Sequence, residues 1–333
     1  MNIYDRAELS KQAKQFGFVR DTYEKVCRLS EILGFIENDT FLSNCLALKG
    51  GTAINLTILP LPRLSVDIDL DFAKNYSRQE IEEIKDNIVE KFHIFMTNKG
   101  YIFAKSKSKI THALHSWVFS YINTGGVEDN IKIEINYMLR ERILMPEIRT
   151  VKDIPGFTTS KVLCINPVEI YGAKITALLS RTAARDLYDV NSMLEHKILS
   201  DQNKDLLRKC VIFYKILNCD EAFEKIDTSA IEKIPFSKIR SDLFPVIRSN
   251  EKKFDLPTTI SFVKSSLEKI LIMTPGEKEF ISRFYQKEYK PELLFTSNDI
   301  VERLKNHPMI KWKLLNMDIT VKKTYYFTKP TSR

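Results

Sequence analysis

Two short stretches decide how this chain folds: LALKGGTAINL at residues 46–56 and RLSVDIDLDF at residues 63–72. The first predicts a short apolar strand, a turn at Gly50 and Gly51, and a helix that follows Thr52. The second alternates acidic and apolar residues, which is the period of a strand with one polar and one apolar face. Together they predict the order strand, glycine turn, helix and acidic strand.

Asp67 and Asp69 are predicted to hold a metal ion. Residues two apart in a strand project from the same face, with Cα atoms roughly 6.5–7 Å apart. Two carboxylates so placed repel each other unless a positive charge lies between them. Mg²⁺ fits this arrangement, because it is usually held by one or two carboxylates together with substrate phosphates. Asp71 has the same parity but lies outside the motif, and the alternative for the whole strand is a solvated edge.

The glycine pair predicts a phosphate site. Gly50 and Gly51 have no Cβ, so the chain can turn sharply and backbone N–H groups can approach a phosphate. The N-terminus of a following helix adds positive potential, and Thr52 adds a hydroxyl. Alone, the glycine pair would indicate an ordinary strand-to-helix turn. Followed by the acidic strand, it favours a nucleotide site.

The rest of the chain predicts an α/β (α+β) protein with a small mixed, twisted sheet and flanking helices. Helical periodicity covers residues 3–37, and a Ser77–Glu80 capping box opens a second helix that runs to about 99, with Gly100 as its stop. Strand-like segments follow at 101–105, 117–122 and 131–138, and from 167 onward the pattern is helical. We predict two domains, residues 1–160 with the sheet and residues 161–333, mainly helical.

These motifs resemble the nucleotidyltransferase superfamily, and more narrowly the AbiEii/AbiGii toxin family, to which the MenT toxins are related. The resemblance covers roughly residues 45–195 and rests on three motifs, namely Gly50-Gly51-Thr52, Arg63-Leu64-Ser65-Val66-Asp67-Ile68-Asp69, and Lys174 followed by Arg185-Asp186-Leu187-Tyr188-Asp189.

The resemblance implies an enzyme that transfers NMP from an NTP with Mg²⁺ as cofactor. It implies that Lys174 contacts the triphosphate and that Asp186 is essential. The residues it implies for nucleotide binding are Gly50, Gly51, Thr52, Arg63, Ser65 and Lys174. Many superfamily members carry a third carboxylate on a later strand, and Glu134 in the alternating segment 131–136 fits that place, either as a base or as an ordinary exposed charge.

The resemblance also implies a biological role. It points to a toxin of a toxin–antitoxin pair that adds nucleotides to the 3′ end of tRNA, which blocks aminoacylation and translation. NTP, tRNA and a cognate antitoxin are the expected partners.

The segment around Lys174 allows a second interpretation from its spacing. Arg181, Arg185 and Asp189 lie four apart, so they would stack on one face if the helix that starts at 167 ran through them. Arg181 and Asp189 are then equally compatible with a surface salt-bridge ladder and with the site. His112 and His115 have no third ligand nearby in sequence, and we expect structural roles for them.

Charge and composition restrict the possible partners. The net charge is +8, and residues 201–333 carry 25 basic against 18 acidic side chains, which is +7. The segments 311–313 and 322–327 mix lysines with aromatics, as nucleic-acid binders do, although amphipathic packing explains them nearly as well. No apolar run is long enough to span a membrane, and the five cysteines are scattered, so we expect a cytoplasmic, reduced protein.

Two alternatives stay open at this point. The first is a nucleotidyltransferase that modifies a small molecule or a protein hydroxyl, which would present a neutral or acidic acceptor pocket. The second is a nucleotide-binding protein without activity, which would have lost Asp67, Asp69 or Lys174 first.

Overall fold

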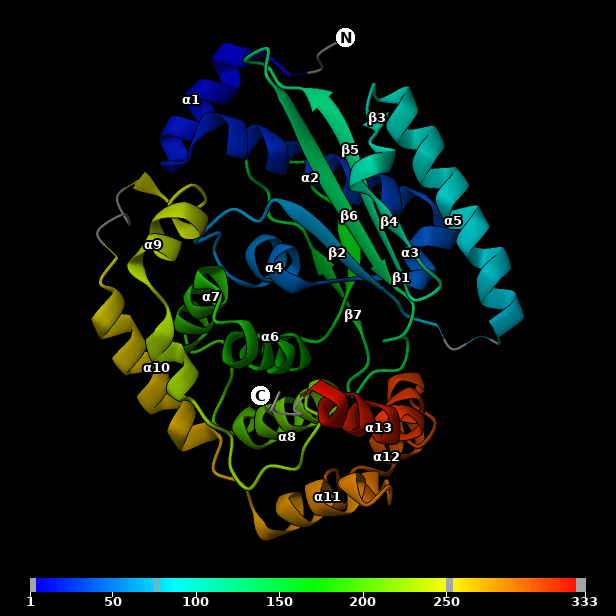
Figure 1. Cartoon of the computed structure of the whole chain (residues 1–333). Coiled ribbons are helices and arrows are strands. Elements are labelled where there is room, and N and C mark those ends of the chain that lie inside the picture. The colour runs from blue at the N-terminus through cyan, green and yellow to red at the C-terminus, as the bar shows by residue number, and fades with distance from the viewer. Residues whose placement is uncertain (1–3, 75, 77, 250–253, 328–333) are drawn as a thin grey trace, which may run out of the picture.

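An eight-stranded mixed sheet organises the protein, in the order β3-β5-β6-β2-β1-β8-β7 with β4 beside β5 (Figure 1). The computed structural model describes residues 4–74, 76, 78–249 and 254–327, and the side chains of all of these except 78 and 318–327. The strands are β1 (Leu46–Lys49), β2 (Asp67–Phe72), β3 (Ile102–Phe103), β4 (Lys109–Ile110), β5 (Leu114–Ile122), β6 (Glu128–Asn136), β7 (Glu147–Thr150) and β8 (Lys161–Cys164). The predicted α/β class with a mixed sheet is confirmed.

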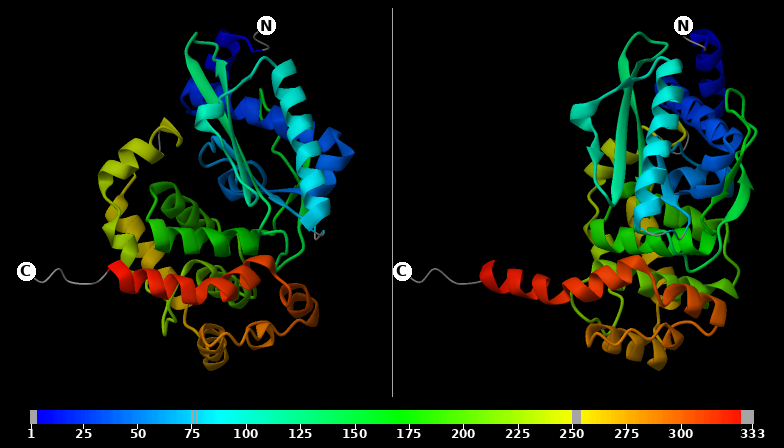
Figure 2. Two further views of the ribbon diagram at one scale, coloured as in Figure 1. Left: turned by 45° about the vertical axis from the view of Figure 1, so that its right-hand side comes forward. Right: turned by 90° about the vertical axis from the view of Figure 1, so that its right-hand side faces the viewer.

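The helices form two groups along the chain. Those interleaved with the sheet are α1 (Arg6–Phe16), α2 (Arg20–Asn38), α3 (Thr40–Cys45), α4 (Gly50–Ala53), the π-helical turn Ile54–Ile58 and α5 (Arg78–Asn98). Those after the sheet are α6 (Pro167–Arg181), α7 (Ala184–Glu195), α8 (Asn203–Asn218), α9 (Phe236–Lys238), the π-helical turn η4 (Ile239–Leu243), α10 (Leu256–Ile270), α11 (Pro275–Tyr285), α12 (Asn298–Leu304) and α13 (Pro308–Phe327). The last helix runs out from the body of the molecule (Figure 2).

The two faces of the sheet differ in character, because one is apolar and packed in the core and the other carries the acidic residues of β2. Strand β2 lies antiparallel to β1 and parallel to β6, and Ile68 is directly opposite Ile133, which is opposite Trp117 of β5. That apolar face is covered by α2 and α5, since Phe92 of α5 lies 5.4 Å from Trp117 and 5.6 Å from Phe35 of α2, measured between ring centroids. The acidic residues of β2 therefore project from the opposite face.

Helix α6, which carries Lys174, packs closely on α8. A Cβ at Gly172 would lie only 2.5 Å from Cβ of Cys210, so only glycine allows α6 and α8 to approach this closely. Strand β8, which immediately precedes α6, pairs in parallel with β1. The sheet thus continues past residue 160, and the division of the chain at that point stays a prediction.

Several local expectations differ from the structure. The helical periodicity predicted at 3–37 corresponds to two helices, α1 and α2, because Gly17 adopts a left-handed conformation and ends α1. The strand predicted at 101–105 is limited to β3, and β4, β7 and β8 were missed, since strands of two to four residues carry too few alternations to be recognised. Gly100 ends α5 as predicted, whereas Ser77 lies outside the described residues. No helix in the described part of the chain is long and apolar enough to cross a membrane.

Candidate active site

The turn between β1 and α4 brings the backbone against the acidic strand. Gly50 has φ +67°, a conformation that L side chains rarely adopt, and a Cβ there would lie 2.5 Å from Oδ2 of Asp69. Only glycine satisfies both conditions. The predicted association of the glycine turn with the acidic strand is therefore a direct contact in the folded chain.

Gly51 and Thr52 hold the turn in place from behind. A Cβ on Gly51 would lie 2.8 Å from both Nη2 of Arg63 and Oγ of Ser65. The buried hydroxyl of Thr52 donates a hydrogen bond to the backbone carbonyl of Asp67. The side chains of Thr52, Arg63 and Ser65 thus support the turn, and the nucleotide contacts that the resemblance implied for them stay a prediction.

Asp67 and Asp69 project from the same face of β2, as their spacing predicted. Burial raises the pKa of Asp67, against the opposing effects of Lys132 and Arg185. Burial also raises the pKa of Asp69, where Glu134 and Asp67 add to the effect of burial. A raised carboxyl pKa means that burial destabilises the ionised forms of these two acids, which a cation bound between them would stabilise.

Asp71, the third acid of the strand, is neutralised by its neighbours. Its Oδ1 lies 2.7 Å from Nζ of Lys49, and its Oδ2 pairs with the buried guanidinium of Arg142. The Arg142 guanidinium also accompanies Glu169, with 3.7 Å between Nη1 and Oε1, and the Tyr214 hydroxyl donates to Glu169 at 2.6 Å. With two cations bound to it, Asp71 is not available as a metal ligand in this arrangement.

Glu134 lies where the sequence placed it, next to Asp69 in the β2–β6 register. Its Oε1 is 2.9 Å from Nζ of Lys132. Burial raises the pKa of Glu134, but hydrogen bonds from Lys132 and Ser116 outweigh that effect and lower it overall. A lowered pKa makes Glu134 a weaker proton acceptor than an ordinary glutamate.

Lys174 sits between two buried aspartates. Its Nζ lies 2.9 Å from Oδ1 of Asp186 and 3.1 Å from Oδ2 of Asp189. Burial opposes its charge, but Asp189 and Asp186 outweigh burial and raise the pKa of Lys174. Arg181 binds the other side of Asp186 with two hydrogen bonds, of 2.7 and 3.0 Å. The ammonium is therefore charged at neutral pH and held between the two carboxylates.

Of the two interpretations of Arg181 and Asp189, the salt-bridge ladder on one helix face does not agree with the structure. Helix α6 ends at Arg181, because Thr182 adopts a left-handed conformation, and α7 begins only at Ala184. Arg181, Arg185 and Asp189 consequently have different partners. The break lets Arg181 fold back on Asp186, which a continuous helix would not allow.

Arg63 links the loop before β2 to Asp189 of α7. Its Nε and Nη2 each lie 2.7 Å from an oxygen of Asp189, and both side chains are buried. Asp189 thus binds Arg63 and Lys174 at once. The backbone of the same loop is bridged to residues 246 and 247, which anchors it to the helical half.

A cavity of about 190 Å³ opens beside this cluster. Its polar wall includes Lys49, Gly50, Asp69, Lys174 and Arg181, and its apolar wall includes Leu139, Ile165, Ile170 and Ala173. Sites that enclose a whole ligand usually measure roughly 300–1,000 Å³, so this cavity would hold only part of a nucleotide. A larger cavity of about 560 Å³ lies between α7, α8 and α10, away from the predicted site residues.

Other expectations concern residues away from the cavity. His115 is buried and lies 3.2 Å from the Tyr137 hydroxyl, so its expected structural role is confirmed. Lys313 is buried, with Nζ 2.6 Å from Oδ1 of Asp220, which favours the packing interpretation of the segment 311–313 over a nucleic-acid surface at this lysine. The side chains of Lys322 to Phe327 lie outside the described residues.

Sequence reasoning missed three cations near the acids: Lys49, Arg142 and Arg185. Lys49 immediately precedes the glycine pair, and its place at the end of a strand was a usable signal. Arg142 is far from every motif in the sequence, so no sequence signal pointed to it. Arg185 belongs to the third motif and to the helical spacing discussed above, but no role in the site was predicted for it.

The residues at the centre of the site fit a divalent cation. The carboxylates of Asp67 and Asp69 share one face of β2, Glu134 lies next to Asp69 in the β2–β6 register, and the missing Cβ of Gly50 lets the Asp69 carboxylate lie against the glycine turn. Among the described residues, no three His, Cys, Asp or Glu side chains form a ready set of metal ligands. Two carboxylates suffice for Mg²⁺ when substrate phosphates supply further oxygens.

Comparisons with known proteins show a family and a similar fold. The sequence profile of the family described as nucleotidyl transferase AbiEii toxin, type IV toxin–antitoxin system, matches residues 35–270. Among solved structures, the chain is similar to MenT4, a nucleotidyltransferase toxin from Mycobacterium tuberculosis, with a TM-score of 0.59 and 14% identity over 93% of this chain and 99% of that chain. At this identity the likeness concerns the fold. No curated protein sequence matches significantly.

Proposed function

Since this chain belongs to the family of nucleotidyl transferase AbiEii toxins, we propose that it transfers NMP from an NTP to the 3′ end of tRNA with Mg²⁺ as cofactor. One observation carries the proposal: Gly50 packs directly against Asp69, and both face a cavity with Lys174 and Arg181 on its wall. A crowded carboxylate pair beside a cluster of fixed cations suits a triphosphate with its metal ion.

The acids, glycines and cations of the site would have separate roles. Asp67 and Asp69 would hold Mg²⁺, which would neutralise charge on the phosphates and help to align the attacking hydroxyl. Gly50 and Gly51 would let backbone N–H groups approach the triphosphate. Lys174 and Arg181, held by Asp186, supply fixed positive charge on the wall of the same cavity.

The remaining motif residues position the groups that would contact the nucleotide and the metal ion. Arg63 orients Asp189, which in turn orients Lys174, so Arg63 is a positioning residue for the ammonium. Thr52 and Ser65 keep the glycine turn against β2. Glu134 could accept the proton of the attacking hydroxyl only after it separates from Lys132.

In the reaction, the acceptor hydroxyl attacks the α-phosphorus of the NTP, its oxygen forms the new phosphodiester bond, and pyrophosphate leaves. The fixed cations around Asp186 stabilise the negative charge that develops on the phosphates. Blocking the 3′ end of tRNA would stop aminoacylation, and a cognate antitoxin would be required to protect the host.

The experiment is a transfer assay with the full chain, total cellular RNA, Mg²⁺ and each of the four labelled NTPs separately. We expect label at the 3′ end of tRNA with one preferred NTP, and no label with Asp69→Asn protein. Label on a protein or on a small hydroxylated compound, with none on RNA, would contradict the proposal in favour of the alternative acceptors.

A further inference from the structure

The two carboxylates of the site have different surroundings. Asp69 lines the cavity together with Lys49 and Lys174. Asp67 does not line the cavity but lies opposite Lys132 in the β2–β6 register, and the charge of Arg185 also acts on it. Arg181 lines the cavity, but Arg185, only four residues later, does not. The break between α6 and α7 separates these two arginines, so the site has a triphosphate side at Asp69 and a second basic side at Asp67.

Arg185 on this second side is available for an anion. It is half-buried, and its Nε donates a 2.7 Å hydrogen bond to the backbone carbonyl of Asp242 in η4. No carboxylate of the described residues lies within ion-pair distance of its guanidinium. An arginine whose position is fixed by a carbonyl while its charge is left unpaired is well suited to binding a phosphate.

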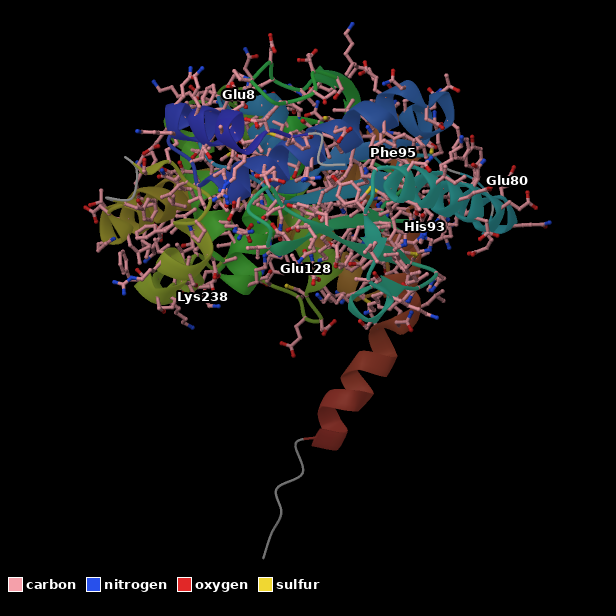
Figure 3. All side chains as sticks on the ribbon, turned by 90° about the horizontal axis from the view of Figure 1, so that it is seen from above. Glu8, Glu80, His93, Phe95, Glu128 and Lys238 are labelled. Carbon is pink, nitrogen blue, oxygen red and sulfur yellow. The ribbon has the colours of Figure 1, made fainter. Side chains whose placement is uncertain are left out.

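The segment that Arg185 contacts has an exposed aromatic ring and another cation. Phe236 of α9 is 44% exposed, and one edge of its ring packs on Phe244 at a centroid distance of 5.9 Å. Cζ of the exposed Arg240 lies 5.8 Å from the centre of the Phe236 ring. Figure 3 shows Lys238, at the end of α9, projecting toward the same side of the molecule as Glu128, at the start of β6.

We propose that the unpaired 3′ end of the RNA acceptor lies along α9 and η4 and reaches Asp67 past Arg185. A base stacks on Phe236, and Arg240 and Arg185 bind successive phosphates. An exposed aromatic next to arginines is the combination that binds single-stranded nucleic acid, because every base has a face that stacks and every nucleotide carries a phosphate. This inference rests on the proposed function and replaces a path over the C-terminal helix, where Lys313 is buried.

The test compares two hairpin RNAs as acceptors, one with an unpaired 3′ end of about four nucleotides and one blunt-ended. We expect wild-type protein to prefer the unpaired end. Phe236→Ala and Arg185→Ala should each raise KM for that RNA by about five-fold to 100-fold and leave KM for the NTP unchanged. Phe236→Tyr should restore the wild-type KM, because tyrosine keeps the stacking face.

Two kinds of control separate this path from its alternatives. Arg181→Ala should raise KM for the NTP and not for RNA, since Arg181 lines the cavity. Trp312→Ala and Lys311→Ala, on the exposed part of α13, should change neither KM. Transfer to RNA with an unchanged KM in both the Arg185 and Phe236 variants, or a raised KM in the Trp312 variant, would overturn the path and leave the proposed function standing. Absence of transfer to any RNA, or transfer to a protein, would overturn both.

Discussion

Arg63 and Asp189 lie 126 residues apart in the chain and form a buried bidentate ion pair, with both N–O distances 2.7 Å. The pair ties the loop before β2 to α7, and the same aspartate holds Lys174. Two motifs that are separate in sequence are thereby one structural unit, in which the position of the ammonium depends on the guanidinium.

Arg63→Ala should destabilise the protein by up to about 3–5 kcal/mol, because the buried Asp189 carboxylate loses its bidentate partner and keeps only Lys174. The decrease should be visible as a lower midpoint of urea unfolding. A double variant, Arg63→Leu with Asp189→Leu, should recover part of the lost stability but not activity, since Lys174 loses one of its two anchors. Equal stability of Arg63→Ala and wild type would contradict the buried pair.

Gly50→Ala should abolish transfer, since its methyl group would displace the Asp69 carboxylate. The left-handed backbone adds a stability cost of about 1–2 kcal/mol. Gly126→Ala is the matched control, because Gly126 has φ +80° and nothing within 4 Å of a Cβ. It should show a similar stability cost with normal activity. An active Gly50→Ala enzyme would mean that the contact with Asp69 is unimportant.

Asp67→Asn and Asp69→Asn should each reduce kcat by about 100-fold or more while the protein stays folded. Burial raises the pKa of both carboxyls, so their ionised forms cost stability at neutral pH and the neutral amides remove that cost. The thermal midpoint at pH 7 should therefore be unchanged or higher. If both variants keep their activity with Mg²⁺ present, the assignment of the metal site is wrong.

Lys174→Ala should weaken NTP binding while RNA affinity stays nearly constant. The variant should remain folded, because Asp189 keeps Arg63 and Asp186 keeps Arg181. Lys174→Arg should rescue poorly, since a planar guanidinium cannot occupy the place of a compact ammonium between two carboxylates. Equilibrium titrations with a labelled NTP and with tRNA separate the two effects. A variant that loses tRNA binding but binds NTP normally would contradict this placement.

Stability should decrease as the pH falls from about 6.5 to about 4. Burial lowers the pKa of His115 from 6.5 to about 4, so in this window the unfolded chain binds a proton that the folded chain does not. The contribution is at most about 3 kcal/mol. His115→Gln should flatten the pH dependence of the unfolding free energy, and His112→Gln, at an exposed position, should not. If the unfolding free energy depends on pH equally in both variants, His115 does not cause the loss of stability at low pH.

The sequence was sufficient to predict the elements that depend on local chain geometry. Alternation of acidic and apolar residues from 66 to 72 determines a strand with one polar face, whatever surrounds it. The glycine pair determines the turn, because Gly50 needs a left-handed backbone. The match of these features to the family followed from the same residues. Short strands such as β7 and the break at Thr182 were not predictable, since few residues specify them and packing decides their conformation.

Only the tertiary structure decided which acids of β2 form ion pairs within the described part of the chain. Asp67, Asp69 and Asp71 alternate identically in sequence, and nothing local distinguishes them. Long-range packing brings Arg142 and Lys49 onto Asp71, and neither cation binds the other two acids as an ion pair. Opposite charges stabilise an ionised carboxylate and burial destabilises it. Asp71 is therefore structural, whereas Asp67 and Asp69 have no ion pair among the described residues and suit a cation.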